Sequence, residues 1–261
     1  MENSLKIIFV AFSENSLGRR IINMMLAEGI TPVGVFMASD EAFKKFRKNG
    51  IRRYFKQNGL FNTLWRMYYR LTLRKDLKDA SLQQDENLKK SIKQVCADNG
   101  IPVGYFDNIN KPEFEEKLRA LNPDLIVLGG APLIKKNIID LPKIAVLNSH
   151  PGILPEAKGM DVVSQSLIDG IPLGATVFKV DEGIDSGPVL LIQYLKEEIK
   201  GKKLHEIEAM VEIVSANAML DGIKKIINND YSFTSQEKRG KVYKALSYLT
   251  YKKVKNKLNT L

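Results

Sequence analysis

The sequence is poor in the residues that build covalent and metal-held frameworks. Its 261 residues include one cysteine and two histidines. A single cysteine excludes an intrachain disulfide, and no grouping of Cys and His has the spacing of a zinc site. Cys96 follows Ile92 and Val95 on an apolar helical face, so we expect it in the core of a reduced protein. His205 has no second His or Cys near it and is expected on a helix surface, so the sequence predicts no metal site.

Long hydrophobic runs are missing as well. No window approaches the ~18 uninterrupted apolar residues that a membrane span needs. The first residues, MENSLKIIFVAF, carry a short apolar run interrupted by Lys6, without a basic leader or a small-residue cleavage site. We therefore expect a buried first strand rather than a signal peptide, and a cytoplasmic protein. Neither G-x-x-x-x-G-K-[ST] nor G-x-G-x-x-G occurs, so a P-loop and a dinucleotide fingerprint both lack support.

Acidic residues are absent from one long stretch. The chain has 40 Lys and Arg against 30 Asp and Glu, a formal charge of +10. Residues 42–75 contain eleven Lys or Arg and no Asp or Glu, and residues 235–261 contain eight Lys or Arg against Glu237. The remainder of the chain is net negative. Two segments therefore carry the positive charge, which favours anionic partners.

The sequence does contain the alternating apolar and amphipathic segments that are typical of an α/β protein. With 44% hydrophobic residues, the chain is long enough for one sizeable core. Short apolar runs alternate with longer amphipathic ones over the first 150 residues, which is typical of a mostly parallel sheet with crossover helices. We expect strands at 5–12, 31–38, 102–106, 124–130 and 144–150, two further strands at 175–180 and 188–198, and helices at 16–29, 111–121 and about 203–227.

An insertion, residues 42–84, separates the second strand from the helix that begins near Asp85, and it is too long for an ordinary crossover loop. Apolar and basic residues recur in it at helical spacing on two sides. The apolar side comprises Phe61, Leu64, Trp65, Tyr68 and Leu71, and the basic side Arg66, Arg70 and Arg74, with Lys44, Lys45, Arg47 and Lys48 upstream. We expect a lid or extra layer whose aromatic face packs on the domain and whose arginines attract an anion. A helix on an anionic membrane surface, through 42–75, and a nucleic-acid contact are the alternatives.

Polar side chains follow one of the predicted strands. In IAVLNSHPG, Asn148 and His150 lie two residues apart, so both point to the same face at the strand's carboxyl end, where such sheets bind ligands. Thirty-five residues later, DEGIDSGP sets Asp185 in a turn framed by Gly183 and Gly187. An amide, an imidazole and a carboxylate without a nucleophilic Ser or Cys indicate acyl transfer between bound partners.

Three motifs in order, PDLIVLGGAPLIKKNII, LNSHPGILPEAKG and GATVFKVDEGIDSGPVL, resemble the folate-dependent formyltransferase family. The resemblance implies a Rossmann-like formyltransferase fold and the co-substrate 10-formyltetrahydrofolate. It covers roughly residues 1–200 as the catalytic domain and leaves 201–261 as a C-terminal helix and basic tail. It also implies that the catalytic residues are Asn148, His150 and Asp185.

The roles of these residues follow from the implied reaction, in which an amine attacks the formyl carbon. Asn148 would donate to the oxygen of the tetrahedral intermediate. His150, held protonated or polarised by Asp185, would supply a second donor and help to protonate the leaving nitrogen. Asp185 would orient the imidazole and take the proton of the amine. Thr176 is similar to a family hydroxyl that holds a water in the site.

The resemblance also implies where the two substrates bind. The pterin would lie against the backbone of residues 130–134 and 181–185, with apolar walls and glycines that allow close approach. The candidate folate-binding residues are Gly130, Ala131, Pro132, Leu133, Ile134, Asp181, Gly183 and Ile184. The candidate residues for binding the amine substrate are Ser13, Asn15, Thr176 and Lys158.

At several positions the sequence differs from the well-known branches of the family, and these differences reduce the number of candidate amine acceptors. AFSENSLG stands where the glycinamide-ribonucleotide branch has a Gly-Asn-Gly-Ser-Asn phosphate loop, and about sixty residues follow residue 200, where the methionyl-tRNA branch has a β-barrel. In HPGILPEAKG, Gly152 and Lys158 replace the Ser and Arg of many members. We expect formylation of an amine on a nucleotide-linked sugar or another phosphorylated small molecule. A methionyl-tRNA formyltransferase-like enzyme, a formyltetrahydrofolate hydrolase and an inactive folate- or RNA-binding protein are the alternatives.

Overall fold

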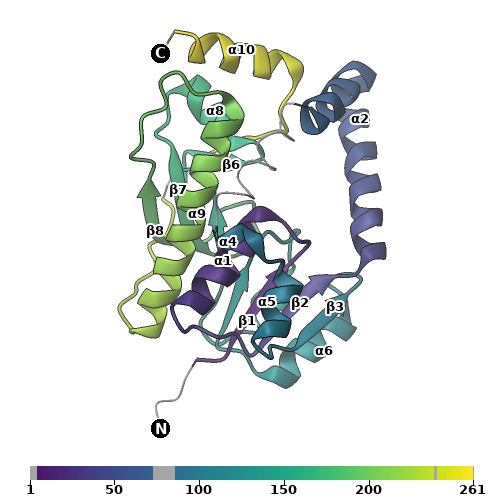
Figure 1. Cartoon of the computed structure of the whole chain (residues 1–261), viewed down its shortest axis with the longest axis vertical. Helices are drawn as coiled ribbons and strands as arrows, with labels where there is room; N and C mark the ends of the chain where they lie inside the picture. The colour runs from purple at the N-terminus through teal and green to yellow at the C-terminus, as the bar shows by residue number, and fades with distance from the viewer. Residues whose placement is uncertain (1–4, 73–85, 238–239, 261) are drawn as a thin grey trace.

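A seven-stranded sheet forms the centre of the computed structural model, which describes residues 5–72, 86–237 and 240–260 (Figure 1). The strand order is β3-β2-β1-β4-β5-β7-β8. The strands are β1 (Ile7–Ala11), β2 (Gly34–Ala38), β3 (Val103–Phe106), β4 (Leu125–Leu128), β5 (Ala145–His150), β7 (Gly174–Lys179) and β8 (Val189–Tyr194). The first five run parallel, whereas β7 is antiparallel to both β5 and β8. The predicted α/β class and mostly parallel sheet are confirmed.

Helices cover both faces of this sheet, because its central strands bury side chains on both sides. One face, which includes Phe9, packs against α1 (Ser16–Ala27), α5 (Ile92–Asp98) and α9 (Leu204–Ile227). The other, which includes Ile8 and Val10, packs against α6 (Pro112–Leu121) and α7 (Lys136–Ile139). A short helix, α4 (Glu86–Lys89), precedes α5 and lies beside α1. Cys96 of α5 is fully buried, as predicted, and burial raises the pKa of its thiol to about 11.

Helix α9 belongs to the same core as the sheet. Its residues Val211, Met219 and Ile223 are buried, and Glu212 pairs with the buried Arg20 of α1 at 3.5 Å. Helix α9, which follows the expected boundary near residue 200, thus covers one face of the seven-stranded sheet.

The basic insertion forms one long element, α2 (Asp40–Leu71), that departs from helical geometry at Gly59, where φ is 77°. That left-handed φ suits glycine and divides α2 into a first arm, residues 40–58, and a second arm, residues 60–71. Figure 1 shows α2 leaving the sheet beside β2 and reaching α10 (Tyr248–Leu258) at the far end of the molecule. Every residue from 43 to 53 is exposed, and Phe46 contacts Phe12 after β1 with ring centroids 4.6 Å apart.

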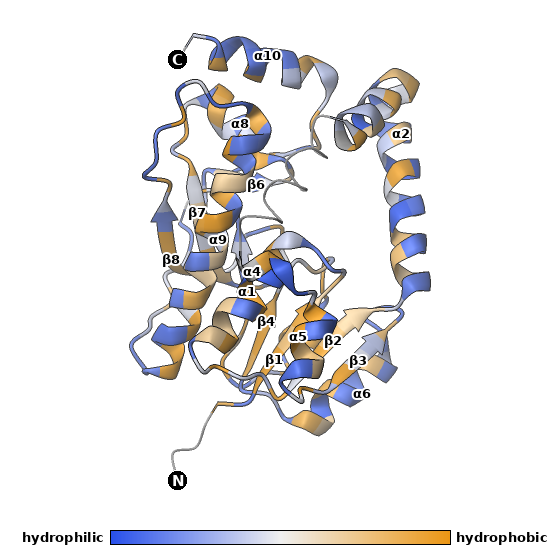
Figure 2. Ribbon diagram, in the orientation of Figure 1, coloured by the Kyte–Doolittle hydropathy of each residue, from blue (hydrophilic) through white to orange (hydrophobic). Residues whose placement is uncertain are grey.

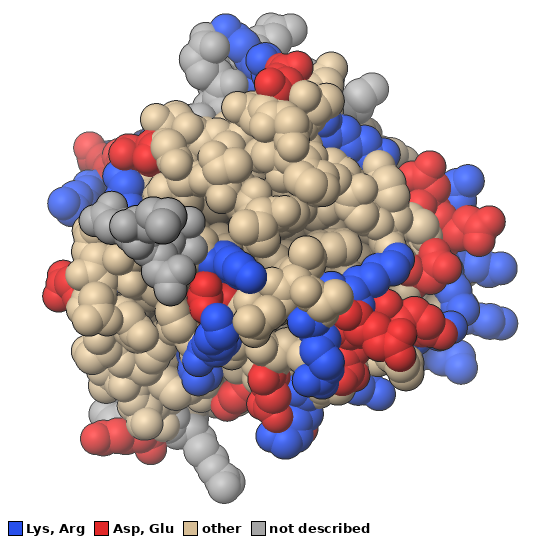
Figure 3. All heavy atoms as spheres, turned by 90° about the horizontal axis from the view of Figure 1, so that it is seen from below, with Lys and Arg blue, Asp and Glu red and all other residues tan. Residues whose placement is uncertain are grey.

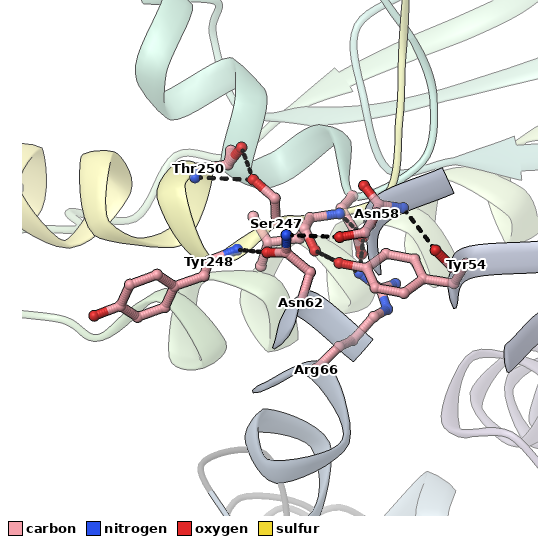
Figure 4. Close-up of polar contacts among 9 residues, drawn as sticks. Tyr54, Asn58, Asn62, Arg66, Ser247, Tyr248 and Thr250 are labelled. Carbon is pink, nitrogen blue, oxygen red and sulfur yellow. Dashed lines mark hydrogen bonds and ion pairs between the residues drawn. The ribbon is translucent and has the colours of Figure 1, made fainter. Parts of the chain in front are cut away.

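Polar contacts attach the second arm and the end of the first arm to the C-terminal segment (Figure 4). The Tyr54 hydroxyl donates to the Leu246 carbonyl at 2.8 Å, and the Tyr248 backbone N–H donates to Asn62 Oδ1 at 3.0 Å. The Arg66 guanidinium pairs with Asp161 Oδ2 at 2.9 Å. Trp65 and Tyr69 pack on Tyr251 of α10, with ring centroids 5.3 Å apart in both pairs. Helix α2 is thus an arch that contacts the protein near its start, through Phe46, and along its second arm.

The face of the second arm that packs on the protein differs from the predicted one. Phe61, Leu64, Tyr68 and Leu71 are between 57% and 66% exposed, so the expectation that they are buried against the domain is wrong. Trp65 packs as expected, and Arg66, which we placed on a solvent-facing basic side, is mostly buried in its ion pair. Helical periodicity had identified two faces, and the packed one is the mixed aromatic and polar face because its hydroxyl, amide and guanidinium groups all find partners. The Arg70 side chain and Arg74 lie outside the described residues.

A two-stranded parallel sheet joins the catalytic region to the C-terminal segment. It pairs β6 (Ala157–Gly159) with β9 (Lys241–Tyr243). Helix α8 (Val162–Asp169) follows β6 and packs against α10. Neither β6, β9 nor α8 was expected from the sequence.

A search of the described helices for one that is long and apolar enough to cross a membrane gives none.

Candidate functional site

The end of β5 sets two polar side chains on one face of the sheet. Asn148 pairs with Phe178 of β7 and His150 with Thr176, two positions along the same strand. Ser149 between them points to the opposite face and donates its hydroxyl to the Ser215 carbonyl of α9 at 2.8 Å. The period-two prediction for Asn148 and His150 is therefore confirmed.

Both ring nitrogens of His150 have a partner, and the side chain is almost fully buried. Nε2 lies 2.8 Å from the Ala157 carbonyl, and Nδ1 lies 3.5 Å from Asp185 Oδ2. Since a carbonyl can only accept, Nε2 carries a hydrogen. Burial lowers the pKa of His150, although the Asp185 carboxylate opposes this shift. The two nitrogens of the ring thus face two oxygens, the Ala157 carbonyl at Nε2 and the Asp185 carboxylate at Nδ1.

Asp185 reaches His150 because its loop is held tightly. Its backbone adopts a left-handed φ of 47°, and its Oδ2 accepts the Gly159 backbone N–H at 2.8 Å. Gln236 Nε2 donates to the Asp185 carbonyl at 3.1 Å and to the Gly187 carbonyl at 2.7 Å. Gly187 has no room for a side chain, because an added Cβ would lie 1.8 Å from the Lys179 carbonyl oxygen. Glycine at this position thus lets the loop fold back and present Asp185 to the imidazole.

The Asn148 side chain remains available. Its amide makes no hydrogen bond with any residue in the described ranges, and it is only partly buried. An amide N–H beside an imidazole and a carboxylate can donate to an oxygen that becomes negative during a reaction. The structure therefore brings together the three predicted catalytic residues.

The Thr176 hydroxyl, which we expected to contact the substrate or a water, makes hydrogen bonds with the backbone instead. It is fully buried, donates its hydroxyl to the Gly152 carbonyl at 2.8 Å, and accepts the Leu154 N–H at 3.1 Å. The hydroxyl is thus occupied in holding the loop that follows His150.

The predicted folate edge divides into exposed and core positions. The segment after β4 begins at Gly130, which has a φ of 78° and whose carbonyl accepts the Phe12 N–H at 3.0 Å. Leu133 is 74% exposed and available as a wall, whereas Ile134 is buried in the core. Ala131 and Pro132 are partly exposed.

The side-chain amide of Asn110 fixes the backbone of residues 133–135. It donates to the Leu133 carbonyl at 2.9 Å and accepts the Lys135 N–H at 2.7 Å. Asn110 was not predicted, because its partners are more than twenty residues away and no local motif marks it.

The second predicted folate segment is an exposed turn. The Asp181 carboxylate accepts from the Gly183 N–H at 3.0 Å and from the Ser186 hydroxyl at 2.7 Å, so it shapes the turn itself. Gly183 and Ile184 are exposed. The backbone of the turn is therefore fixed while its outer surface is free.

The predicted substrate contacts near α1 are largely structural. Asn15 caps α1 by accepting the Gly18 N–H at 2.8 Å, and its amide donates to the Gly129 carbonyl at 2.8 Å. It therefore ties the helix to the end of β4 rather than facing a ligand. Ser13 is partly exposed beside it.

Lys158 stands out among the candidates. It is only 7% exposed, and its ammonium group makes no hydrogen bond or ion pair with the residues that the structure describes. It lies on β6 between Ala157 and Gly159, whose backbone groups contact His150 and Asp185. Since most of the Lys158 side chain is buried and its ammonium group has no ion-pair partner within the described ranges, that group is available to an anionic ligand.

Sequence reasoning missed two parts of the site. Gln236 and the backbone of β6 hold Asp185. Gln236 lies in no recognisable pattern. Strand β6 ends one of the motifs quoted above, but that motif did not show that its backbone contacts His150 and Asp185. Within the described ranges, no group of three His, Cys, Asp or Glu side chains could hold a metal ion.

Comparisons with known proteins show which family the chain resembles. A family model for formyl transferases matches residues 5–223. The methionyl-tRNA formyltransferase of Kosmotoga olearia is 30% identical over 148 residues, which cover 56% of this chain and 47% of that protein. That of Finegoldia magna is 30% identical over 167 residues, covering 62% and 54%. The chain thus spans about half the length of the curated relatives it matches.

Solved structures of two other enzymes share the fold. A sugar N-formyltransferase from Shewanella has a TM-score of 0.59 at 12% identity, covering 97% of this chain and 87% of that one. Glycinamide ribonucleotide transformylase 1 from Symbiobacterium toebii has a TM-score of 0.58 at 18% identity, covering 92% and 94%. At these identities the likeness is one of fold.

Proposed function

The chain belongs to the formyl transferase family, and on this premise we propose that it moves a formyl group from 10-formyltetrahydrofolate to a primary amine. The observation that carries the proposal is the assembly of Asn148, His150 and Asp185 at the carboxyl edge of the sheet, with no nucleophilic side chain among them. Such a set serves direct transfer between two bound partners, because it can stabilise an oxyanion and move a proton without forming an acyl-enzyme.

The reaction requires one bond to form and one to break. The amine nitrogen attacks the formyl carbon, and the carbonyl oxygen becomes an oxyanion, to which the Asn148 amide donates. The amine loses a proton to the pair of Asp185 and His150. The bond from carbon to N10 of the folate then breaks, N10 takes up that proton, and the products are a formamide and tetrahydrofolate.

The geometry of His150 favours a role in proton transfer. Its Nε2–H is already donated to the Ala157 carbonyl, so the free lone pair is on Nδ1, 3.5 Å from Asp185 Oδ2. A proton that arrives at Asp185 can be passed between these two atoms. A second oxyanion donor from His150, as expected from the sequence, would require Nε2 to leave Ala157.

For the folate we propose the edge formed by residues 130–134 and 181–185. Leu133 and Ile184 offer exposed apolar side chains, at 74% and 48%, and the fixed backbones of the two segments offer hydrogen-bonding groups to a pterin. The buried side chain of Ile134 supports this edge from below.

For the acceptor we propose a phosphorylated small amine, such as an amino sugar linked to a nucleotide. Lys158 supports an anionic acceptor, because it lies between the two residues whose backbone groups contact His150 and Asp185 and its ammonium group has no ion-pair partner in the described ranges. The alternative acceptor, methionyl-tRNA, is favoured by the names of the sequence relatives, of which this chain spans about half.

Tetrahydrofolate release separates these functions. The protein is incubated with 10-formyltetrahydrofolate alone, with a panel of nucleotide-linked amino sugars, and with methionyl-tRNA. Tetrahydrofolate release that depends on an amino sugar supports the proposal. Release that depends on methionyl-tRNA would show that the acceptor is tRNA and not a small phosphorylated amine. Release without any amine indicates a hydrolase, and no release despite folate binding indicates an inactive site. In the productive reaction, Asn148→Ala should abolish turnover while folate binding persists.

A further inference from the structure

The second arm of α2 presents an apolar face to the outside of the molecule. Six large side chains recur along residues 60–71 at spacings that place them on one side of a helix. Their exposed fractions are 61% for Leu60, 64% for Phe61, 57% for Leu64, 44% for Met67, 58% for Tyr68 and 66% for Leu71. Exposed apolar side chains grouped in this way mark an interaction surface, whereas single ones do not.

The direction of this face is fixed by the other side of the same helix. Trp65 and Tyr69 pack on α10, Arg66 pairs with Asp161, and Asn62 accepts the Tyr248 N–H. Figure 4 shows Asn62 and Arg66 pointing from α2 to the segment that leads into α10. The apolar face therefore cannot turn inward without breaking these contacts.

The apolar surface continues onto α10, where basic residues lie next to it. The rings of Phe61 and Tyr248 are 5.3 Å apart, and the neighbouring Leu249 is 69% exposed. The Lys252 ammonium lies 5.7 Å from the centre of the Tyr248 ring. Exposed basic residues flank the face on both sides, namely Arg52, Arg53 and Lys56 on the first arm and Lys252, Lys253 and Lys255 on α10. Figure 2 shows the mixture of apolar and hydrophilic residues along both elements.

These two elements carry little acidic charge of their own. Residues 42–75 and α10 contain no Asp or Glu. The face seen from below in Figure 3, by contrast, carries Asp and Glu mixed with Lys and Arg. The second arm of α2 and α10 therefore combine exposed apolar and cationic side chains without an acidic residue in either.

We propose that the second arm of α2 and α10 bind the surface of an anionic phospholipid bilayer. The apolar face would enter the interface at the level of the headgroups, and the flanking Lys and Arg would contact lipid phosphates. The inference is independent of the formyl transfer proposed above, since none of these residues belongs to the catalytic set.

Two other occupants fit the observations less well. A second copy of this chain on a two-fold axis would bring identical basic clusters together and would be repelled. A nucleic acid would use the arginines and lysines, but Leu60, Leu64 and Leu71 neither stack on bases nor bind phosphates. Only a bilayer satisfies the aliphatic and the cationic groups at once.

Vesicle flotation tests the proposal with the full chain. Vesicles of phosphatidylcholine mixed with phosphatidylglycerol should carry the protein, and vesicles of phosphatidylcholine alone should carry far less. The double variant Leu64→Glu with Leu71→Glu should lose at least about tenfold in partitioning. Ile227→Glu is the matched control, since Ile227 is a 43% exposed residue at the end of α9. It should bind like the unmodified protein. Lys252→Glu with Lys253→Glu should weaken binding to anionic vesicles and make it less sensitive to salt.

Circular dichroism and thermal unfolding check that the variants fold, and light scattering reports their oligomeric state. Absence of binding to anionic vesicles would overturn the proposal, as would equal binding by the Leu64 and Leu71 double variant. A dimer that this double variant converts to a monomer would assign the face to a second copy, and salt-sensitive retention of tRNA without vesicle binding would assign it to nucleic acid. Formyl transfer to a soluble amine without vesicles should be unchanged in all these variants, so a failure of either proposal is distinguishable from a failure of the other.

Discussion

At the scale of the residue, the pair of His150 and Asp185 has the most direct consequence for turnover. Under the proposed mechanism, His150→Ala and Asp185→Asn each remove one of the two groups that share the transferred proton. We expect each to lower turnover at least ~100-fold, a loss of roughly 3 kcal/mol of transition-state stabilisation, while folate affinity changes far less. Steady-state kinetics with the acceptor that the panel identifies measure this. Near-complete activity in either variant would remove that residue from the mechanism.

The burial of His150 also makes stability depend on pH. The pKa of His150 is lowered in the folded protein. As the pH drops below ~6.5, this histidine therefore binds a proton in the unfolded chain before it does so in the folded chain. The free energy of unfolding should therefore fall as the pH drops below this value, by up to about 1.4 kcal/mol per pH unit. Urea unfolding between pH 7 and pH 5 should show the slope in the unmodified protein and its reduction in His150→Gln.

Thr176 acts on the same site through the backbone. Its hydroxyl satisfies the Gly152 carbonyl and the Leu154 N–H, both in the loop after His150. Thr176→Val should lower the free energy of unfolding by about 2 kcal/mol, because two buried backbone groups lose their partner. Thr176→Ser should restore most of the stability. Equal stabilities of the Val and Ser variants in urea unfolding would show that the hydroxyl contributes nothing.

At the scale of the element, α2 depends on a few polar contacts. Arg66 donates to Asp161 and to the Leu246 carbonyl, and its guanidinium lies 4.9 Å from the centre of the Tyr54 ring. Arg66→Ala should therefore cost about 2 kcal/mol and speed proteolytic cleavage within α2. Arg53→Ala, on the exposed part of the same helix, should stay within about 0.5 kcal/mol of the unmodified protein. If the two variants unfold at the same urea concentration, the arch is held by its aromatic contacts instead.

The strands of the main sheet and the helices α1, α6 and α9 could be predicted from the sequence, because each has one dominant periodicity. For the insertion, helical periodicity does not predict which face of the helix packs on the protein. Residues 60–71 have two plausible faces, and the choice between them is made by Asp161, Leu246 and Tyr251, which are remote in the sequence. The strand β6 is three residues long and pairs with a strand more than eighty residues later, so no local pattern identifies it.

At the scale of the whole molecule, one core joins the sheet to α9, so ligand binding should stabilise the chain as a unit. A reduced folate at about 100 times its Kd should add about 2.7 kcal/mol to the free energy of unfolding and raise the Tm by several degrees in a single transition. Differential scanning calorimetry measures this. The absence of any shift at millimolar folate would contradict the proposed co-substrate.

Asn148, His150 and Asp185 could be proposed from the sequence, because strand alternation, a Gly-framed turn and the motifs of one family all point to them. The groups that hold His150 and Asp185 could not be predicted. The Ala157 carbonyl and the Gly159 N–H are backbone groups, for which the identity of the residue carries little information, and the Gln236 side chain donates to a carbonyl 51 residues away in the sequence.

The pairing of β6 with β9 connects the two ends of this arrangement. Strand β6 supplies the Ala157 carbonyl to His150 and the Gly159 N–H to Asp185, and β9 leads within a few residues to Leu246, which contacts both Tyr54 and Arg66 of α2. If the second arm of α2 and α10 bind a bilayer, the pairing of β6 with β9 and the short segment from β9 to Leu246 connect the lipid-bound surface to the pair of His150 and Asp185. Thermodynamic linkage then acts in both directions: whatever free energy the bilayer adds to substrate binding, substrate adds to bilayer binding. Formyl transfer would be reported at the membrane as a change in the residence time of the enzyme.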